Sequence, residues 1–253
     1  MDPRPDIVII GSRLLSRYPQ LRSGMSTRGG GVSPEPLGMN LSYKVGDEAG
    51  RVDMNRELFF GRLGIRVPDL AIPGQVHGDA IAVVRGSGNY PATDGLMSGN
   101  PGVFLVVTVA DCLPVFLFDP RTRTVAMVHA GWRGSGSGIV EKAVRLMTSQ
   151  RGVRPGDLIA FLGPCAGVCC YGVRDDVAGQ FPRRHIREKD GKLFLDLREI
   201  NHEMLLGAGV PGTSIELSDQ CTICGPRLFH SYRRDRERSG RMMAVIGLEP
   251  PLR

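Results

Sequence analysis

The chain has 253 residues, of which 42% are hydrophobic and 23% charged, proportions that are ordinary for a soluble globular protein with one large domain or two small ones. Its net charge is +6, carried by 28 arginines and 4 lysines against 26 acidic residues. No apolar run approaches the roughly 20 residues that span a bilayer, so we expect no membrane-spanning helix.

The sequence also bears on nucleic-acid binding, on secretion and on the redox state of the cysteines. The basic runs at 183–185 and 232–236 come without an RNA-binding signature or a helix-turn-helix pattern, so we expect no nucleic-acid partner. The first 20 residues lack the pattern of a signal peptide, and we therefore expect a cytoplasmic protein. In that compartment the six cysteines are expected to be reduced thiols.

The predicted elements begin with a short apolar run at 7–10, followed by loop chemistry between residues 26 and 42. A helix is expected over 46–64, where apolar residues recur at helical spacing. A strand, a loop and a second strand follow over 69–84, and the loop contains Gln75-Val76-His77-Gly78. Residues 93–95, Thr-Asp-Gly, are predicted to form a turn.

The segment 103–138 has the most informative pattern. Apolar runs at 103–109 and 115–118 predict two strands, separated by Ala110-Asp111-Cys112-Leu113-Pro114. A third run at 124–128 ends at His129, and a glycine-rich loop at 131–138 leads into a helix expected over 139–147. Cys112 and His129 therefore lie at strand ends, where a rigid sheet presents chemistry to solvent. The junction of the loop and the helix is also a candidate anion site.

The C-terminal half continues with strands expected at 158–162, 193–195 and 243–246. Asp196 followed by Glu199 is typical of a capping box and predicts a helix that ends at 207–209. Strands and helices interleave without a strict βαβ rhythm, repeats or an obvious linker. We therefore predict an α/β (α+β) fold in which residues 1–253 form a single domain with mixed sheets flanked by helices.

Three residues suit a borderline-soft metal such as zinc. His77, Cys112 and His129 supply two imidazoles and a thiolate, and three protein ligands leave a fourth position open for water or substrate. Taken singly, each residue has an ordinary alternative as a structural histidine or a buried thiol.

The other cysteines have part of the pattern of a second zinc site. Cys221 and Cys224 have CxxC spacing, while Cys165, Cys169 and Cys170 lie in GPCAGVCCYG. A four-cysteine zinc site is normally built from two such pairs. Because only one clean pair is present, the favoured interpretation is that these cysteines are small buried thiols.

Several blocks of the sequence resemble the YfiH-like family, which has been called polyphenol oxidase or laccase-domain, purine nucleoside phosphorylase, and peptidoglycan editing factor. The blocks are QVHG at 75–78, TVADCLPV at 108–115 and HAGWRG at 129–134, with others in order from TRGGGVS at 27–33 to SYRRD at 231–235. The resemblance implies a mixed α/β fold and a metal site of His77, Cys112 and His129, usually zinc and sometimes copper. It also implies phosphorolysis of adenosine, inosine and methylthioadenosine, together with deamination of adenosine.

Purine nucleosides and phosphate are then the expected partners of a monomer or small homo-oligomer. Arg28, Arg133 and Arg233 are candidate phosphate holders, and Asn40 is a candidate for the ribose hydroxyls. The alternatives are surface charges for the arginines and a turn residue for Asn40. Asp111 either orients a metal ligand or caps its turn, and a surface position is the favoured interpretation of a sixth candidate, His230, in the block FHSYRRD.

Chemistry separates the activities implied by the family's names. A multicopper oxidase needs a blue-copper site of two histidines and one cysteine and a separate histidine-rich cluster, and five histidines cannot supply both. The cytidine-deaminase pattern H-x-E is absent at His129, so deamination would depend on a zinc-bound water. Two other readings stay open. One is a Cys–His hydrolase, with Cys112 as nucleophile and His129 as base, acting in peptidoglycan editing. The other is a binding protein with a structural metal.

Overall fold

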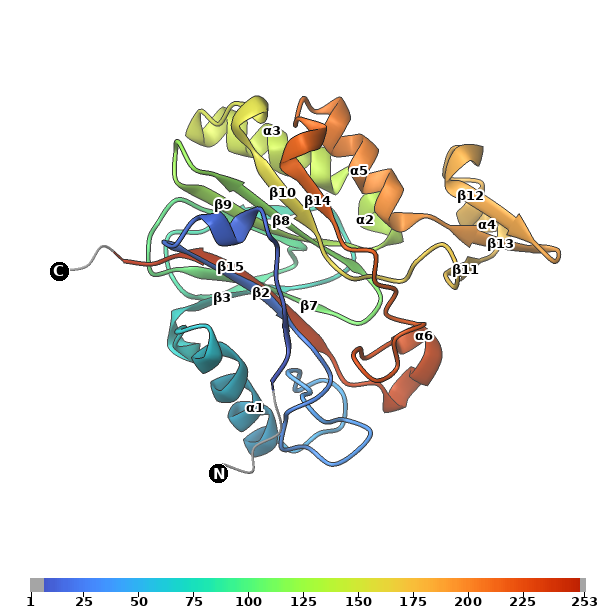
Figure 1. The fold of residues 1–253 in the computed structure, drawn as a ribbon, viewed down its shortest axis with the longest axis horizontal. Coiled ribbons are helices and arrows are strands. Elements are labelled where there is room, and N and C mark those ends of the chain that lie inside the picture. Colours follow the sequence, from blue (N-terminus) through green and yellow to red (C-terminus); the bar gives the residue numbers. More distant parts are fainter. Residues whose placement is uncertain (1–6, 251–253) are drawn as a thin grey trace.

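The computed structural model describes residues 7–250 and arranges them around two six-stranded sheets (Figure 1). The strand order of the first sheet is β1 (Ile9–Ile10), β2 (Leu21–Ser26), β15 (Met242–Leu248), β7 (Phe104–Val109), β3 (Leu70–Gly74), β5 (Gly88–Pro91). The strand order of the second sheet is β14 (Ile215–Leu217), β10 (Ile159–Leu162), β8 (Leu113–Asp119), β9 (Thr124–Ala130), β6 (Gly95–Ser98), β4 (Ile81–Val83). Both sheets mix parallel and antiparallel pairs.

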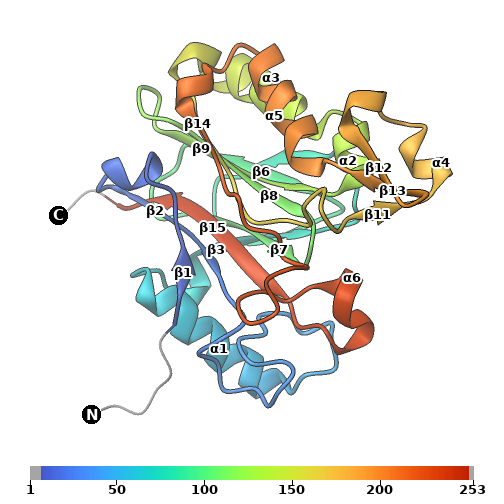
Figure 2. The same cartoon turned by 45° about the vertical axis from the view of Figure 1, so that its right-hand side comes forward.

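A third, smaller sheet lies beside the second large sheet and α5 (Figure 2). Its strand order is β11 (Gly172–Val173), β13 (Lys192–Leu195), β12 (Ile186–Lys189). The α-helices are α1 (Ala49–Arg62), α2 (Trp132–Gly136), α3 (Ile139–Arg151), α4 (Asp175–Ala178), α5 (Leu197–Gly207), α6 (Tyr232–Asp235). In the part of the chain that is described, none of these helices has the length and apolar character needed to cross a bilayer.

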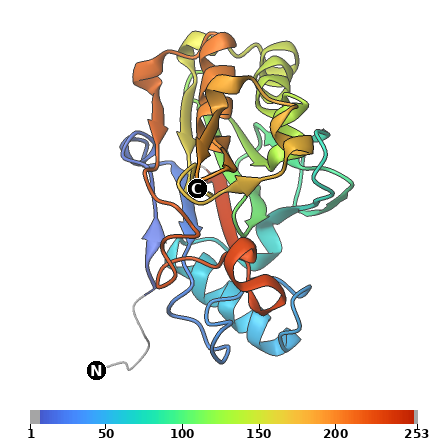
Figure 3. The same cartoon turned by 90° about the vertical axis from the view of Figure 1, so that its right-hand side faces the viewer.

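The two large sheets pack face to face, and helices cover their outer faces (Figure 1, Figure 3). Phe59 and Phe60 of α1 pack against the outer side of the first sheet. The apolar face of α3, including Val140 and Met147, packs with α5 against the outer side of the second sheet. The layers are therefore helix, sheet, sheet and helix, and the apolar core between the sheets is separate from the two cores under the helices.

This layering explains the long apolar runs of the sequence. All seven residues of β8 are buried. Phe116 and Phe118 point into the core between the sheets, while Val115 and Leu117 point toward α3. A strand that is buried on both faces has no polar alternation, and burial of each large apolar side chain stabilises the fold by about 1.5–3 kcal/mol relative to exposure.

The predicted α/β (α+β) fold is confirmed, as are most predicted elements: the helices at 46–64, 139–147 and after Asp196, and the strands along 69–84, 103–118, 158–162, 193–195 and 243–246. The capping of α5 is also as expected, because the Asp196 carboxylate accepts a hydrogen bond from the Glu199 N–H at 3.0 Å. The apolar run at 7–10 contributes only the two-residue strand β1.

One expectation about the central segment was wrong. Residues 131–138 are not simply a loop, because α2 forms within them. The buried Ser135 hydroxyl accepts a hydrogen bond from Asn201 of α5 at 2.8 Å, and this tertiary contact outweighs the low helix propensity of the glycines. The expectation that His129 lies at a strand end is confirmed, because His129 is the penultimate residue of β9.

Candidate metal centre

The hairpin formed by β8 and β9 brings Cys112 and His129 to the same edge of the second sheet. Leu113 pairs with Ala130, and Pro114 pairs with His129. Cys112 comes one residue before this register begins, so it lies across from the chain that follows His129. The two residues are distant in sequence, yet the pairing of the strands fixes their proximity.

A second pairing brings His77 and Asp94 to that edge. Gly95 of β6 pairs with Val128 of β9, so Asp94 lies next to His129. Gly95 also pairs with Ile81 of β4, and the loop before β4, which carries His77, therefore reaches the same place.

The side chains of His77, Cys112 and His129 converge. Each offers one ligand atom, and these atoms lie within 4.8 Å of one another. The two imidazole rings have centroids 5.0 Å apart and are inclined by 77°. His129 is buried, Cys112 is half-buried and His77 is exposed, so the group is open to solvent on the side of His77. The role of the three residues as metal ligands and catalytic residues stays a prediction.

Asp94 is the residue that holds this arrangement together. Its fully buried carboxylate accepts hydrogen bonds from the backbone N–H groups of Val76 at 3.1 Å, His77 at 3.0 Å and Gly78 at 2.8 Å. The same carboxylate lies 2.8 Å from Nδ1 of His129. A proton on Nδ1 therefore leaves Nε2 of His129 free to act as a ligand, which is the usual way that a neighbouring carboxylate orients a metal-binding histidine.

The Cys112 thiol and the His129 imidazole perturb each other's protonation. Burial raises the pKa of Cys112, but the adjacent His129 and His77 outweigh it and leave that pKa below its ordinary value. Burial lowers the pKa of His129, but Cys112 and Asp94 outweigh it and leave that pKa above its ordinary value. In the absence of a metal the pair therefore favours thiolate and imidazolium, and the thiolate is the form of cysteine that binds metals and attacks electrophiles.

The passage from β7 to β8, just before Cys112, is fixed by contacts from distant segments. Asp111 has a φ of 88°, which is unfavourable for a residue other than glycine. Its carboxylate accepts hydrogen bonds from the Thr222 hydroxyl at 2.7 Å and from the Arg233 N–H at 2.6 Å, while its carbonyl accepts one from the Ala166 N–H at 2.8 Å. These contacts hold the strained backbone that presents the Cys112 sulfur.

Two glycines allow the segments to approach closely. A Cβ atom at Gly131 would lie 3.2 Å from the Cys112 sulfur and 3.4 Å from the ring of His77. A Cβ atom at Gly134 of α2 would lie 2.8 Å from the Gly78 carbonyl, in the loop that carries His77. Two imidazoles and a thiolate around a space that a methyl group would crowd fit a zinc ion with one open position.

The four residues predicted to bind substrate are placed differently from one another. Arg233 lies beside the site, because its guanidinium is 5.1 Å from the ring of Tyr171 and its backbone N–H binds Asp111. Arg133 is exposed on α2 and stacks on Trp132 at 4.3 Å. Arg28 pairs with Glu35 and donates to the Pro226 carbonyl.

Asn40 is fully buried and its amide is already in use. The amide nitrogen donates to the Ser42 carbonyl and to Asp47, both at 2.9 Å, and the amide oxygen accepts from the N–H groups of Ser42 and Arg241. These contacts give Asn40 a structural role in its loop.

His230 is likewise fully buried rather than at the surface, which makes that expectation wrong. Neither of its ring nitrogens has a hydrogen-bond partner, and burial lowers its pKa to about 3. His230 is therefore neutral at physiological pH.

Sequence reasoning missed three residues near the site. Asp94 looked like an ordinary turn residue. Tyr171 is buried, and burial together with the charge of Cys112 raises its pKa, so its hydroxyl stays protonated within electrostatic range of Cys112. Arg241 is close enough for the charges of Asp111 and Cys112 to affect its pKa, although burial makes the net change a decrease. No local motif marks Arg241.

The prediction of small buried thiols is confirmed for Cys165 and wrong for four other cysteines. Cys165 is fully buried. Cys169 and Cys224 are exposed, Cys170 and Cys221 are half-buried, and these four lie close together. The adjacent residues 169 and 170 sit in a turn, so their side chains do not alternate as they would in a strand.

Comparisons with known proteins agree on one family. The family model described as multi-copper polyphenol oxidoreductase laccase matches residues 22–249. The purine nucleoside phosphorylase YlmD of Geobacillus stearothermophilus is 36% identical over 244 residues, which cover 89% of each chain. The adenosine deaminase RL5, from an unknown prokaryotic organism, is 33% identical over 227 residues, covering 83% of this chain and 86% of its own. The solved structure of the hypothetical protein YfiH of Bacillus licheniformis matches with a TM-score of 0.90 at 33% identity, over 98% of each chain.

Proposed function

This chain belongs to the laccase-like family of YfiH and YlmD described above, and we propose that within it the chain acts as a zinc-dependent purine nucleoside phosphorylase that also deaminates adenosine. The observation that carries the proposal is the convergence of His77, Cys112 and His129 at a solvent-accessible edge, backed by the Asp94 carboxylate. The activities for which the relatives are named supply the substrate class.

The positions of the other histidines favour one metal ion over a multicopper centre. His185 lies 3.2 Å from Glu203, and His202 lies 3.3 Å from Glu199. Both are thus engaged with carboxylates. His230 is fully buried, and among the described residues only His77 and His129 belong to a group of three or more metal-ligating side chains. This leaves a single site with two histidines and one thiolate, which suits zinc in a catalytic arrangement.

Phosphorolysis breaks the bond between the purine nitrogen and C1′ of the ribose and forms a bond from C1′ to a phosphate oxygen. The protein must therefore hold an anion next to the sugar. Arg233 and Tyr171 are our candidates for this task, because a guanidinium and a protonated hydroxyl lie together within electrostatic range of Cys112. Arg241 adds a second positive charge within electrostatic range of Cys112.

Zinc at this site would polarise a substrate oxygen or nitrogen, or lower the pKa of a bound water to about 7. The protein's own contribution is orientation. Asp94 fixes the ring of His129 and the loop of His77 with four hydrogen bonds. Asp111 fixes the approach of Cys112.

One specific observation favours a second candidate function. The lowered pKa of Cys112, the adjacent His129 and the orienting Asp94 form a Cys–His–Asp series like that of a cysteine hydrolase. In that case the thiolate would attack an acyl substrate and a bound metal would inhibit. The two functions make opposite predictions for metal removal.

The test uses purified protein with adenosine and phosphate. Zinc-loaded protein is expected to release adenine and ribose 1-phosphate, and to form inosine and ammonia in parallel. Chelation is expected to abolish both reactions, and added zinc to restore them, whereas a Cys–His hydrolase would become more active toward acyl substrates on chelation. Cys112→Ala serves as the inactive variant. Absence of any product from metal-replete protein, at phosphate concentrations far above those of the nucleoside, would reject the phosphorylase proposal.

A further inference from the structure

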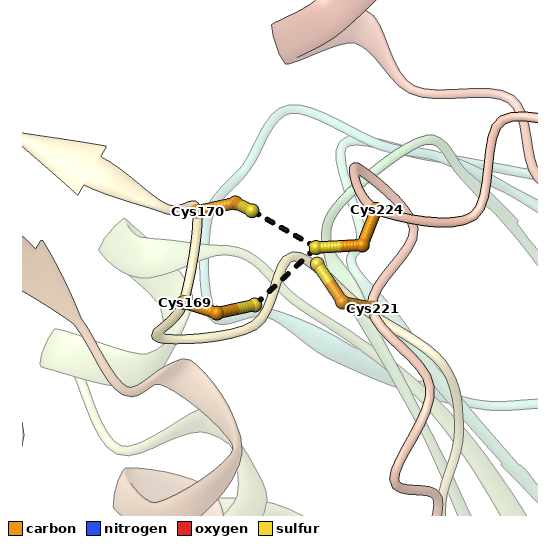
Figure 4. Close-up of side chains that lie close together, drawn as sticks. All are labelled: Cys169, Cys170, Cys221 and Cys224. Carbon is orange, nitrogen blue, oxygen red and sulfur yellow. Dashed lines mark hydrogen bonds between the residues drawn. The ribbon is translucent and has the colours of Figure 1, made fainter.

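A second group of metal-ligating side chains lies apart from the centre just described. Cys169, Cys170, Cys221 and Cys224, here called the four-cysteine cluster, have sulfur atoms that all lie within 4.8 Å of one another (Figure 4). The Cys224 sulfur is 3.0 Å from that of Cys170 and 3.5 Å from that of Cys169. All four are free thiols.

Backbone contacts hold the two pairs of cysteines against each other. Cys170 and Tyr171 donate N–H hydrogen bonds to the Gly167 carbonyl at 2.9 and 2.8 Å, which closes the turn that carries the first pair. Thr222 donates to the Cys165 carbonyl at 3.0 Å, which joins the loop of the second pair to the loop of the first. The convergence therefore follows from the fold of both loops and not from flexible side chains alone.

Gly167 also brings the loops together. A Cβ atom there would lie 3.3 Å from the Cys169 sulfur and 3.3 Å from Cβ of Cys221, so a larger residue would push the pairs apart. The Gly167 N–H points at the Cys221 sulfur, at 3.3 Å. A backbone N–H aimed at a sulfur stabilises the negative charge of a thiolate, as the hydrogen bonds to the sulfurs of metal–thiolate sites do.

The dimensions of the cluster match a single tetrahedral ion. A zinc–sulfur distance of about 2.3 Å places the four sulfurs of a tetrahedral site about 3.8 Å apart. The sulfurs here are free thiols that all lie within 4.8 Å of one another, so small movements of the side chains would bring them to the separations around one ion. An iron–sulfur cluster contains several metal ions and inorganic sulfides, and its cysteine ligands must stand farther apart than around one ion.

We propose that the four-cysteine cluster binds one zinc(II) ion through four thiolates, as a structural metal site separate from His77, Cys112 and His129. Binding forms four zinc–sulfur bonds and releases the four thiol protons, with no change in oxidation state. The site has no open coordination position, so it supports the fold and performs no chemistry.

The ion would stabilise the loops that hold Asp111. Thr222 lies between Cys221 and Cys224 in sequence, and its hydroxyl donates to the Asp111 carboxylate at 2.7 Å. Tyr171 directly follows Cys170, and the charge of Cys112 acts on its hydroxyl. Zinc at the four-cysteine cluster would therefore fix the segment that binds Asp111 and the segment that carries Tyr171, without contacting the candidate metal centre itself.

The first measurement needs no mutation. Protein purified under reducing conditions is stripped with a chelator, incubated with zinc(II) alone, freed of excess metal and analysed for zinc by elemental analysis. About two zinc ions per chain are expected, one for each site. Alkylation followed by peptide mass spectrometry should show that zinc protects all four cysteines of the cluster. Equal alkylation with and without zinc overturns the proposal, as does recovery of the cluster as disulfides or with bound iron.

Variants assign the ions to their sites. Cys224→Ser and Cys169→Ser should each lower the zinc content from about two ions to about one, and Cys112→Ala should remove the other ion. Cys165→Ala is the matched control, because this cysteine neighbours the cluster but contributes no sulfur to it, and its zinc content should equal that of the wild type.

Cobalt(II) provides a readout that depends on the number of thiolates. Cys112→Ala loaded with cobalt should retain the strong sulfur-to-cobalt absorption of a four-thiolate site, and Cys224→Ser should keep only the weaker band of a site with one thiolate. If wild type binds one metal ion and Cys224→Ser binds it equally well, the cluster is not a metal site and the proposal fails.

Discussion

Replacing Asp94 with asparagine tests the arrangement of the candidate metal centre most directly, because Asp94→Asn keeps the shape of the side chain and changes only its charge and one acceptor. In the native carboxylate, Oδ1 accepts hydrogen bonds from the N–H of His77 and from Nδ1 of His129. Oδ2 accepts from the N–H groups of Val76 and Gly78. An asparagine has one oxygen and one NH₂ group. In either orientation of the amide, the NH₂ group therefore takes the place of an oxygen that accepted two hydrogen bonds, and those two donors lose their acceptor.

The magnitude follows from these four bonds. A buried donor left without a partner costs about 1–3 kcal/mol, so two of them cost about 2–6 kcal/mol of unfolding free energy if the loop does not relax. Proteins of this kind have about 5–15 kcal/mol in total, and the variant should still fold. If the NH₂ group faces His129, the imidazole must present Nδ1 as an acceptor and loses its preference for a free Nε2. Loss of such an orienting partner weakens metal binding by about 10–100-fold.

Two assays on the same samples separate stability from metal binding. Urea unfolding of metal-free protein gives the loss of stability, and competition with a zinc chelator gives the affinity. Asp119→Asn is the matched control, because Asp119 is equally buried and accepts hydrogen bonds from Arg121 and Thr122 at the far end of the β8–β9 hairpin. Asp119→Asn should lower the stability of the fold but leave the zinc affinity at the site of His77 unchanged. Our account of the site is wrong if Asp94→Asn binds zinc there as tightly as wild type does.

Three further predictions rest on other features of the centre. Gly134→Ala should destabilise the fold by about 1–3 kcal/mol and weaken zinc binding, because the new Cβ would lie 2.8 Å from the Gly78 carbonyl. Thermal unfolding measures the first effect and zinc competition the second. An unchanged zinc affinity would contradict the close packing of α2 on the His77 loop. In metal-free protein, the reaction of Cys112 with iodoacetamide should have a pH midpoint below the ordinary thiol value of about 8.5. His129→Gln should raise that midpoint, and zinc should block the reaction. An unshifted midpoint would refute the ion pair of Cys112 and His129. The pKa of Asp94 is lowered because the hydrogen bonds from His129, Gly78 and Val76 outweigh burial. The contribution of Asp94 to stability is therefore present above the unfolded pKa of about 3.9 and is lost as the pH falls through the folded pKa. Unfolding curves at acid pH should show a weaker pH dependence for Asp94→Asn than for wild type.

The strands of the central segment could be predicted because burial on both faces leaves a strong local signal. In β8 every residue is buried, and the apolar run at 115–118 marks it without reference to the rest of the chain. β2 and β6 escaped prediction for the opposite reason. The sequences Leu-Arg-Ser-Gly-Met-Ser and Gly-Leu-Met-Ser have little β-propensity, and both segments are strands because β15 and β9 pair with them.

The residues of the candidate site also fall into some that the sequence predicts and others that it does not. His77, Cys112 and His129 could be proposed from their residue types and their positions beside apolar runs. Asp94 could not, because Thr-Asp-Gly is explained fully as a turn, and its contact with His129 follows from the long-range register of β6 and β9. The spacing of the sequence disfavours the four-cysteine cluster, since adjacent cysteines are not a knuckle pair, whereas in the structure a turn directs both toward Cys224.

The crossing of the chain at Asp111 has a consequence for how the protein matures. β7 belongs to one large sheet and β8 to the other, so Cys112 lies at the seam between them. The donors of a zinc finger are neighbours in sequence and can capture an ion as the chain emerges from the ribosome. Here the three side chains converge only after β4, β6, β8 and β9 have paired, so a metal ion would enter this centre after the second sheet has formed.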